Sequence, residues 1–495
     1  MKPNEILNSE RQRLEAQHDG RENWRLWGPY LAERAWGTVR EDYSEGGSAW
    51  DYLDHDQARS RAYRWNEDGM GGICDDKQRL CFALALWNGE DPILKERAFG
   101  LTGNQGNHGE DVKEHYFYLD ATPSHSYLRY LYKYPQAAYP YARLVAENGR
   151  RSRQDPPFSL LDTGVFDDQR YWDVEVLYAK ASPEEIHIRI IASNRGPQAA
   201  KLHVLPTLWF RNTWSWGAGV DEWGAPKAVR KPLLAAAPAP SGAQWAVRAD
   251  DETLGAYFLY GRQQAEPLYT ENESNAERLW NRANATPYVK DAFHRYVVDG
   301  DLAAVNPART GTRFAARHVL TATAGQTVTI ELTLARCERQ TPFAQQEAVF
   351  VQREAEATIF YENLQPHCSS EDGRILRQSL AGMIWSKQFF HFDVARWQDG
   401  DQLPPPAKRK LGRNRTWRHM KAADIISMPD KWEYPWFAAW DLAFHCAALA
   451  LVDVDFAKGQ IELLLKRTTT RTWRSSATSS SWPSPTRSPV TARRV

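Results

Sequence analysis

The sequence predicts a multidomain α+β protein in which a β-rich region precedes a helical region. Residues 165–335 contain runs of alternating apolar and polar residues, which are typical of antiparallel strands with one exposed face. After Pro342 the apolar residues recur at helical spacing instead. The chain has 495 residues, which is too long for one ordinary core, so two domains are expected.

The elements follow in order along the chain. Residues 1–23 are polar with a short helical pattern, and residues 24–141 carry aromatic residues, glycine and aspartate at strand-and-loop spacing. The clearest alternating runs predict an antiparallel β-sandwich, and they are Asp173–Tyr178, Ile186–Ile190 and Thr327–Leu332. Helices are predicted over Phe343–Leu364, Ile375–Phe392, from after Pro435 to Leu451, and Phe456–Lys466.

The last stretch, residues 467–495, departs from this pattern. It is rich in Arg, Ser and Thr and contains no Asp, Glu or Lys. A disordered tail is one interpretation. We expect instead an out-of-frame translation that starts near Lys466, because isolated tryptophans are unusual in disordered tails.

Charge and composition restrict the partners. The chain has 62 basic and 62 acidic residues and thus no net charge. A partner that is attracted by net charge, such as nucleic acid or an anionic membrane surface, is therefore not expected. Twenty-one Trp and twenty-one Tyr suit stacking on sugar rings, although aromatic residues also fill large cores. The high aromatic content therefore has two possible explanations, a carbohydrate partner or packing in a large core.

The scattered cysteines and the lack of a long apolar run both bear on the cellular location of the protein. Five cysteines are scattered without a CxxC pair, which favours free thiols in a reducing compartment. No signal peptide and no apolar run long enough to cross a membrane are visible, so a soluble cytoplasmic protein is expected. The stretch His108–His115 gathers imidazoles and carboxylates, but its spacing matches no familiar ligand pattern. No metal and no cofactor are predicted.

The segment from Trp432 to His445 carries the strongest chemical signal. It places six aromatic residues around Glu433, Asp441 and His445. Aromatic side chains keep water from a nearby carboxyl group, and such a group tends to have a raised pKa. A carboxyl group that stays protonated near neutral pH is what cleavage of a glycosidic bond by a general acid requires.

Several motifs together resemble glycoside hydrolase family 63, in particular its long bacterial and fungal branch labelled mannosyl-oligosaccharide glucosidase-like. The resemblance covers about residues 24–466, and the motifs are Asn104–Glu114, Tyr132–Gln136, Trp385–Phe390, Gly412–Asn414, Trp417–His419, Asp424–Pro435 and Trp440–His445.

The resemblance implies a β-sandwich domain over residues 24–340, followed over 341–466 by the first part of an (α/α)6 barrel. It also implies hydrolysis of α-linked glucosyl or mannosyl units with inversion, with Asp441 as the general acid. The family's general base is a glutamate on a later barrel helix, and no residue of this chain corresponds to it. The sequence therefore predicts an acid without its base, or a carbohydrate-binding remnant without catalysis.

The remaining candidates are predicted to bind the substrate. For Asp441 and for these candidates a purely structural role is the alternative. Asp441 could cap its helix, and His445 shares its helical face and could touch the substrate, tune Asp441 or pack in the core. The other candidates are stacking faces or hydroxyl contacts: Trp385, Lys387, Gln388, Arg413, Asn414, Trp432, Glu433, Trp436 and Trp440.

Overall fold

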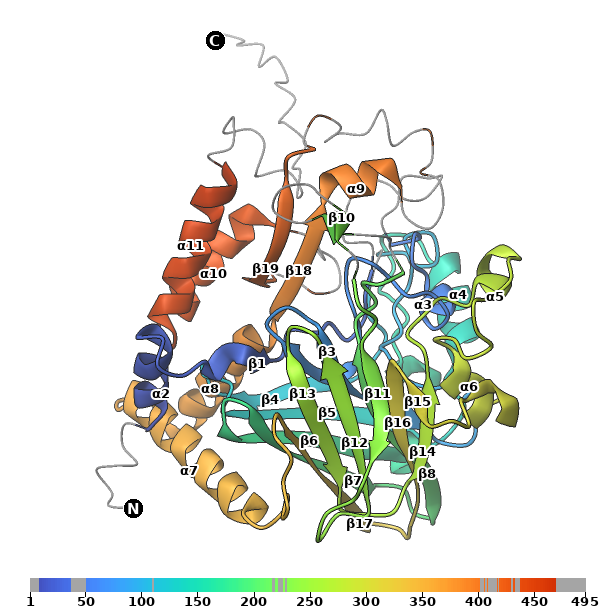
Figure 1. Cartoon of the computed structure of the whole chain (residues 1–495), viewed down its shortest axis with the longest axis horizontal. Helices are drawn as coiled ribbons and strands as arrows, with labels where there is room; N and C mark the ends of the chain where they lie inside the picture. The colour runs from blue at the N-terminus through green and yellow to red at the C-terminus, as the bar shows by residue number, and fades with distance from the viewer. Residues whose placement is uncertain are drawn as a thin grey trace.

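The computed structural model describes residues 9–36, 50–108, 111–215, 219–220, 226–227, 229–400, 405, 407, 416, 418–428, 431 and 437–468. Two large antiparallel sheets form its lower half, and helices with a separate strand hairpin lie beside and above them (Figure 1). The chain is therefore α+β, as the sequence predicts.

The first sheet has six strands. In spatial order they are β1 (Trp27–Gly28), β2 (Met70–Asp75), β3 (Leu80–Trp87), β8 (Ala200–Phe210), β16 (Arg313–Ala322) and β14 (Glu266–Thr270). Strand β3 is buried along almost its whole length, which explains its continuous apolar sequence.

The second sheet has nine strands. In spatial order they are β15 (Thr310–Gly311), β11 (Leu233–Ala237), β12 (Trp245–Asp251), β13 (Gly255–Gly261), β17 (Thr327–Ala335), β7 (Glu185–Asn194), β6 (Tyr171–Ser182), β5 (Tyr127–Pro135) and β4 (Tyr116–Ala121). The three alternating runs of the sequence lie in the neighbouring strands β6, β7 and β17.

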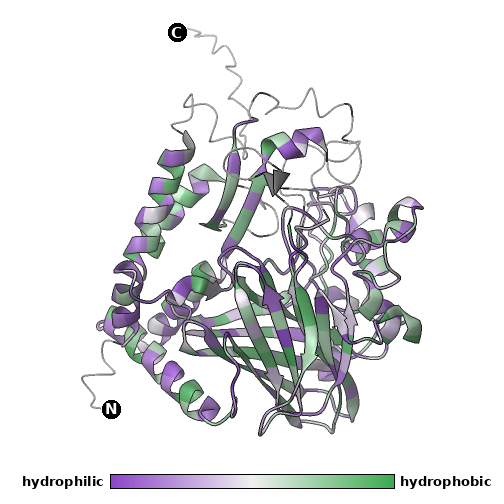
Figure 2. Cartoon of the chain, in the orientation of Figure 1, coloured by the Kyte–Doolittle hydropathy of each residue, from purple (hydrophilic) through white to green (hydrophobic). Residues whose placement is uncertain are grey.

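The two sheets share one hydrophobic core. Trp27, Phe82 and Leu208 of the first sheet and Val176 and Ile188 of the second belong to the same buried cluster. Figure 2 shows apolar and polar residues interspersed along the strands. The arrangement is a β-sandwich.

Short elements complete the β-rich region. A two-stranded pair joins β9 (Gly219–Val220) to β10 (Pro226–Lys227). The short helices are α3 (His55–Ala58), α4 (Tyr141–Arg150), α5 (Ala276–Trp280) and α6 (Ala292–Val297), with single 3-10 turns at Trp24–Leu26, Leu161–Thr163, Asp167–Gln169 and Leu302–Ala304.

The N-terminal helix and the helices after residue 341 are α2 (Ser9–His18), α7 (Gln346–Leu364), α8 (Ser370–Trp385), α9 (Val394–Asp399), α10 (Ala439–Leu449) and α11 (Val454–Thr468). Helices α7 and α8 pack on the second sheet, α2 packs on α7, and α9, α10 and α11 lie above the sheets beside the separate strand hairpin (Figure 1). Of the four positions that the helical spacing predicts to face inward, α7 buries Val349, Phe350 and Phe360, whereas Ile359 is half-buried. That the helices after residue 341 are the first part of an (α/α)6 barrel stays a prediction.

One predicted helix is partly wrong. Helix α8 ends at Trp385, and the residues expected to continue it form strand β18 (Lys387–Asp393), paired with β19 (Lys421–Ser427). The run Phe389, Phe390 and Phe392 contains three aromatic residues, which favour a strand when a partner strand covers their backbone groups.

All five cysteines are free thiols. Within the described ranges, no helix is long and apolar enough to cross a membrane. Over the same ranges, no group of three or more His, Cys, Asp or Glu side chains is arranged to hold a metal ion.

Candidate functional site

Five of the predicted site residues lie outside the described residues: Arg413, Asn414, Trp432, Glu433 and Trp436. The tail from residue 469 and the motif residues Gly109 and Glu110 also lie outside them. The predicted site residues that the structure describes are Trp385, Lys387, Gln388, Trp440, Asp441 and His445.

One end of the β18–β19 hairpin brings most of the described candidates together. Lys387 stands opposite Ser427 in the strand pair, and the Met428 amide donates to the Ser386 carbonyl at 2.9 Å. Helix α10 returns to the same place, because the Ser427 Oγ and His445 Nδ1 lie 2.9 Å apart. The motif at Trp385–Phe390 and the motif that includes Ser427, about forty residues later in the sequence, thus meet at one end of the hairpin.

Asp441 lies in the first turn of α10 and is half-buried. His445 follows it by one helical turn, as the spacing predicts. Burial lowers the pKa of His445, and the Asp441 charge opposes that shift. A neutral imidazole and a carboxyl group therefore share one face of α10.

Gln388 points to the helical side of the hairpin. Phe390 and Phe392, on the same face of β18, belong to the cluster that packs against Leu442 of α10. The Gln388 side chain is buried, and its Oε1 has no hydrogen-bond partner in the described part of the chain. A buried amide with an unused acceptor suits recognition of a hydroxyl group.

Trp385 and Lys387 are enclosed by protein. The Trp385 ring stacks on Tyr118 with centroids 5.2 Å apart, and its Nε1 donates to the Asp120 carbonyl at 3.0 Å. The Lys387 ammonium lies 3.6 Å from Asp453 Oδ2 and 3.2 Å from His125 Nε2. Burial lowers the pKa of Lys387 to about 8, and Asp453 opposes that shift. Their sugar contacts stay predictions.

Trp440 is 67% exposed and its ring lies 5.5 Å from that of Phe444. This aromatic pair on the outer side of α10 is open to a ligand or to further polypeptide. The spacing of four residues predicts that the two rings are neighbours, but it does not tell which side of the helix they cover.

Glu33 is a buried carboxyl group that the sequence analysis missed. It accepts a hydrogen bond from the Tyr118 hydroxyl at 2.8 Å, and burial raises its pKa, with Lys431 opposing that shift. The Lys431 ammonium donates to the Leu31 carbonyl at 2.9 Å. Leu31 and Glu33 therefore lie beside Lys431, the residue that directly precedes Trp432 in the sequence. No periodic pattern around residue 33 indicates this role.

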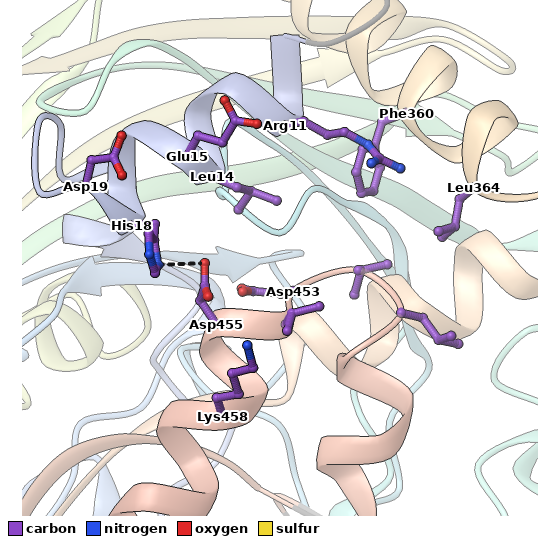
Figure 3. Close-up of a pocket in the computed structure, with 13 residues that line it drawn as sticks. Arg11, Leu14, Glu15, His18, Asp19, Phe360, Leu364, Asp453, Asp455 and Lys458 are labelled. Carbon is purple, nitrogen blue, oxygen red and sulfur yellow. Dashed lines mark ion pairs between the residues drawn. The ribbon is translucent and has the colours of Figure 1, made fainter.

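A cavity of about 690 Å³ lies between α2, α7 and the start of α11 (Figure 3). His18 Nδ1 and Asp455 Oδ2 form an ion pair of 3.2 Å across it. Asp453 also lines the cavity, and it pairs with Arg25 at 2.5 Å as well as with Lys387. Lys387, one of the predicted site residues, therefore contacts Asp453, a carboxylate that lines this cavity.

No family model matches the chain. The chain is 40% identical over 514 residues to the uncharacterised protein YMR196W of Saccharomyces cerevisiae. This alignment covers 94% of the chain and 46% of the yeast protein, so the chain spans about half the length of the curated relative it matches.

Solved structures share only a weak likeness with the chain. A galactose mutarotase-like protein from Lactobacillus casei has a TM-score of 0.21 and 8% identity, covering 51% of this chain and 88% of its own. A galactose mutarotase related enzyme from Lactobacillus acidophilus has a TM-score of 0.21 and 8% identity, covering 51% and 87%. A polysaccharide lyase has a TM-score of 0.23 and 9% identity, covering 53% and 26%. Their titles name carbohydrate enzymes, but likenesses this weak carry no argument about the chain.

Proposed function

We propose that the chain belongs to an inverting α-glycosidase-type protein that acts on α-linked glucosyl or mannosyl units. The observation that best supports this proposal is the placement of Asp441. It is half-buried, one helical turn from His445, on a helix that packs against the strand carrying Gln388. In the proposal Asp441 is the general acid, which gives its proton to the departing oxygen.

Inversion also needs a second carboxyl group that activates a water, with the two groups about 6.5–9.5 Å apart. The proposal assigns no residue of this chain to that role. Gln388, Trp440 and His445 bind the sugar in this proposal, and Arg413, Asn414, Trp432, Glu433 and Trp436 contribute from the motif segments. Trp385 and Lys387 stay predicted sugar contacts, and both side chains are buried.

A non-catalytic carbohydrate-binding protein is the second candidate. The unused Gln388 acceptor and the exposed Trp440 ring support it, because both suit binding and neither performs a proton transfer. For either function we propose a reducing, cytoplasmic location, which the five free thiols support.

Calorimetric titration with α-linked and β-linked disaccharides, together with a hydrolysis assay, tests the proposal. We expect α-linked ligands to bind the wild-type chain and an Asp441→Asn variant alike. Any turnover should fall about 10²–10⁴-fold in Asp441→Asn. Asp455→Asn on α11 is the matched control and should leave turnover unchanged.

Equal turnover in the wild type and Asp441→Asn would show that the acid assignment is wrong. Saccharide binding without hydrolysis in any variant would favour the non-catalytic candidate. No binding of any α-linked saccharide would contradict both candidates.

A further inference from the structure

The exposed positions of helix α10 are all apolar. They are Trp440, Ala443, Phe444 and Ala447. The opposite side of the helix packs into the protein through Leu442, Cys446 and Leu449. The two polar residues of the helix, Asp441 and His445, are half-buried. Helix α10 is therefore apolar on its outer side as well as on its packed side, and a helix of that kind is normally buried in a larger core.

The outer face of α10 has the relief that helix packing uses. Trp440 and Phe444 are four residues apart and their ring centroids lie 5.5 Å apart, so they form a ridge. Ala443 and Ala447, also four residues apart, form a shallow groove beside it. A ridge of this kind fits into the groove of a second helix, and the groove accepts a ridge of that helix. Trp440 is 67% and Phe444 65% exposed, so the described part of the chain leaves the ridge uncovered.

Helix α11 packs beside α10 and gives a useful contrast. Its exposed apolar residues are Val454, Ile461 and Leu465. Its exposed charged residues include Lys458, Glu462 and Lys466. Helix α11 thus mixes apolar and charged residues on its outer side, as a helix in contact with water does, whereas the outer side of α10 carries no exposed charge. Of the two helices, α10 is the one whose sequence requires a cover.

The last residues of the chain do not have the sequence of such a cover. In residues 469–495 the aromatic and branched apolar residues are Trp473, Trp482, Val490 and Val495. These residues are too far apart to form an apolar stripe at helical spacing. Prolines, which disfavour a helix interior, stand at Pro483, Pro485 and Pro489. The cover that α10 requires is therefore another polypeptide segment.

The match to the yeast protein provides a source for this segment, because more than half of that protein lies outside the match. We propose that the outer face of α10 docks an amphipathic helix from the polypeptide that proteins of this length carry outside the matched part. The docked helix presents an apolar stripe, because a charged group would find no partner on the α10 face. Its apolar side chains pack on the Phe444 ring and into the groove at Ala443 and Ala447.

The docking face and the proposed sugar site share one residue. Trp440 belongs to both, whereas Phe444 and the two alanines have no role in the proposed sugar chemistry. The tests of docking therefore change Phe444 and leave Trp440 as it is. A failure of saccharide binding and a failure of docking are then measured separately.

Photo-cross-linking in the intact yeast relative identifies what covers this face. Benzoylphenylalanine is placed at the position that aligns with Phe444, and mass spectrometry identifies the peptide that it captures. We expect a peptide from outside the matched part, with apolar residues at helical spacing. The same probe at the position that aligns with Val319, an isolated exposed residue on β16, is the control and should not capture that peptide.

A substitution gives a second measurement that does not depend on the probe. Phe444→Gln in this chain should leave the unfolding temperature close to that of the wild type, because the ring is exposed. The aligned substitution in the intact yeast protein should lower the unfolding temperature by several degrees. There the glutamine amide would be buried in an apolar helix contact without a hydrogen-bond partner.

Three results would overturn the proposal. The first is a captured peptide from within the matched part, or from a second molecule of the yeast protein, which a mixture of isotope-labelled and unlabelled protein distinguishes. The second is the absence of any captured peptide, which would mean that the aligned position stays in contact with water. The third is an equally small change of the unfolding temperature in both proteins.

Discussion

Lys387 carries a charge in a position that water does not reach. Its side chain has no exposed surface, and its ammonium lies 4.1 Å from the Phe456 ring centroid as well as beside Asp453. Removing a counter-charge from such a place leaves the other charge buried, which costs more than losing a surface ion pair. We therefore expect substitutions at Lys387 to act on stability first.

The pH dependence of stability tests this expectation. The pKa of Lys387 is about 8 in the folded chain and 10.5 ordinarily. Between these values the unfolded chain holds a proton that the folded chain has released, so the free energy of unfolding rises with pH. Relative to a Lys387→Met variant, the wild type should gain roughly 3 kcal/mol between pH 8 and pH 10.5.

Urea unfolding at both pH values measures this difference. Lys458→Met on α11 is the control, because Lys458 is exposed and its substitution should leave the pH dependence of the wild type unchanged. The same pH dependence in the wild type and Lys387→Met would contradict the lowered pKa of Lys387 in the folded chain.

The β18–β19 hairpin is the element that the sequence did not indicate. Strands β6, β7 and β17 were predictable because each alternates apolar and polar residues by itself. Strand β18 instead follows a helix directly, and its partner begins 28 residues after it ends, at Lys421. A local pattern cannot reveal such a partner, because the pairing depends on tertiary contacts.

The same limit applies to the candidate site. The spacing of Asp441 and His445 predicted their common helical face, which α10 provides. Lys387 pairs with Asp453, and the charge of Lys431 acts on Glu33. Both partners are far away in the sequence, so no local pattern could predict them.

Two phenylalanines test how the hairpin packs. Phe392 is 2% exposed and lies against Trp65 and Trp397, whereas Phe444 on α10 is 65% exposed. Phe392→Ala should lower the free energy of unfolding by about 3–5 kcal/mol. Phe444→Ala should change it by no more than about 0.5 kcal/mol. Chemical denaturation compares them, and similar losses in both variants would contradict the described packing.

At the scale of the molecule, the helices α10 and α11 leave apolar side chains uncovered. Trp440 and Phe444 lie one turn apart on α10, Leu451 lies in the turn that follows it, and Val454, Ile461 and Leu465 form a stripe on α11. Their exposed fractions run from 40% at Ile461 to 67% at Trp440. An apolar surface of this kind marks a contact with other polypeptide or a tendency to associate.

Self-association of the purified chain tests the exposure of these stripes. The double variant Phe444→Gln/Leu465→Gln should bind less of an apolar dye and sediment more as a monomer than the wild type. Its free energy of unfolding should stay within about 0.5 kcal/mol. Val319→Gln, at an isolated exposed position on β16, is the control and should leave dye binding unchanged. Equal dye binding in both variants would contradict the prediction.

Asp441 is the proposed proton donor. If the chain carries a general acid but no general base, an added nucleophile can take the place of the activated water. Azide would attack the anomeric carbon of an α-glycoside from the face opposite the aglycone. The bond from carbon to the aglycone oxygen would break, and Asp441 would give its proton to that oxygen.

The most direct measurement is therefore the azide-dependent formation of a β-glycosyl azide from alkyl α-glucosides and α-mannosides. We predict that the wild type and the Asp455→Asn control form it from at least one of these substrates, at a rate that rises with azide. Asp441→Asn should form it about 10²–10⁴-fold more slowly. Product formation by Asp441→Asn at the wild-type rate, or no product with the wild type, would contradict the proposed role of Asp441.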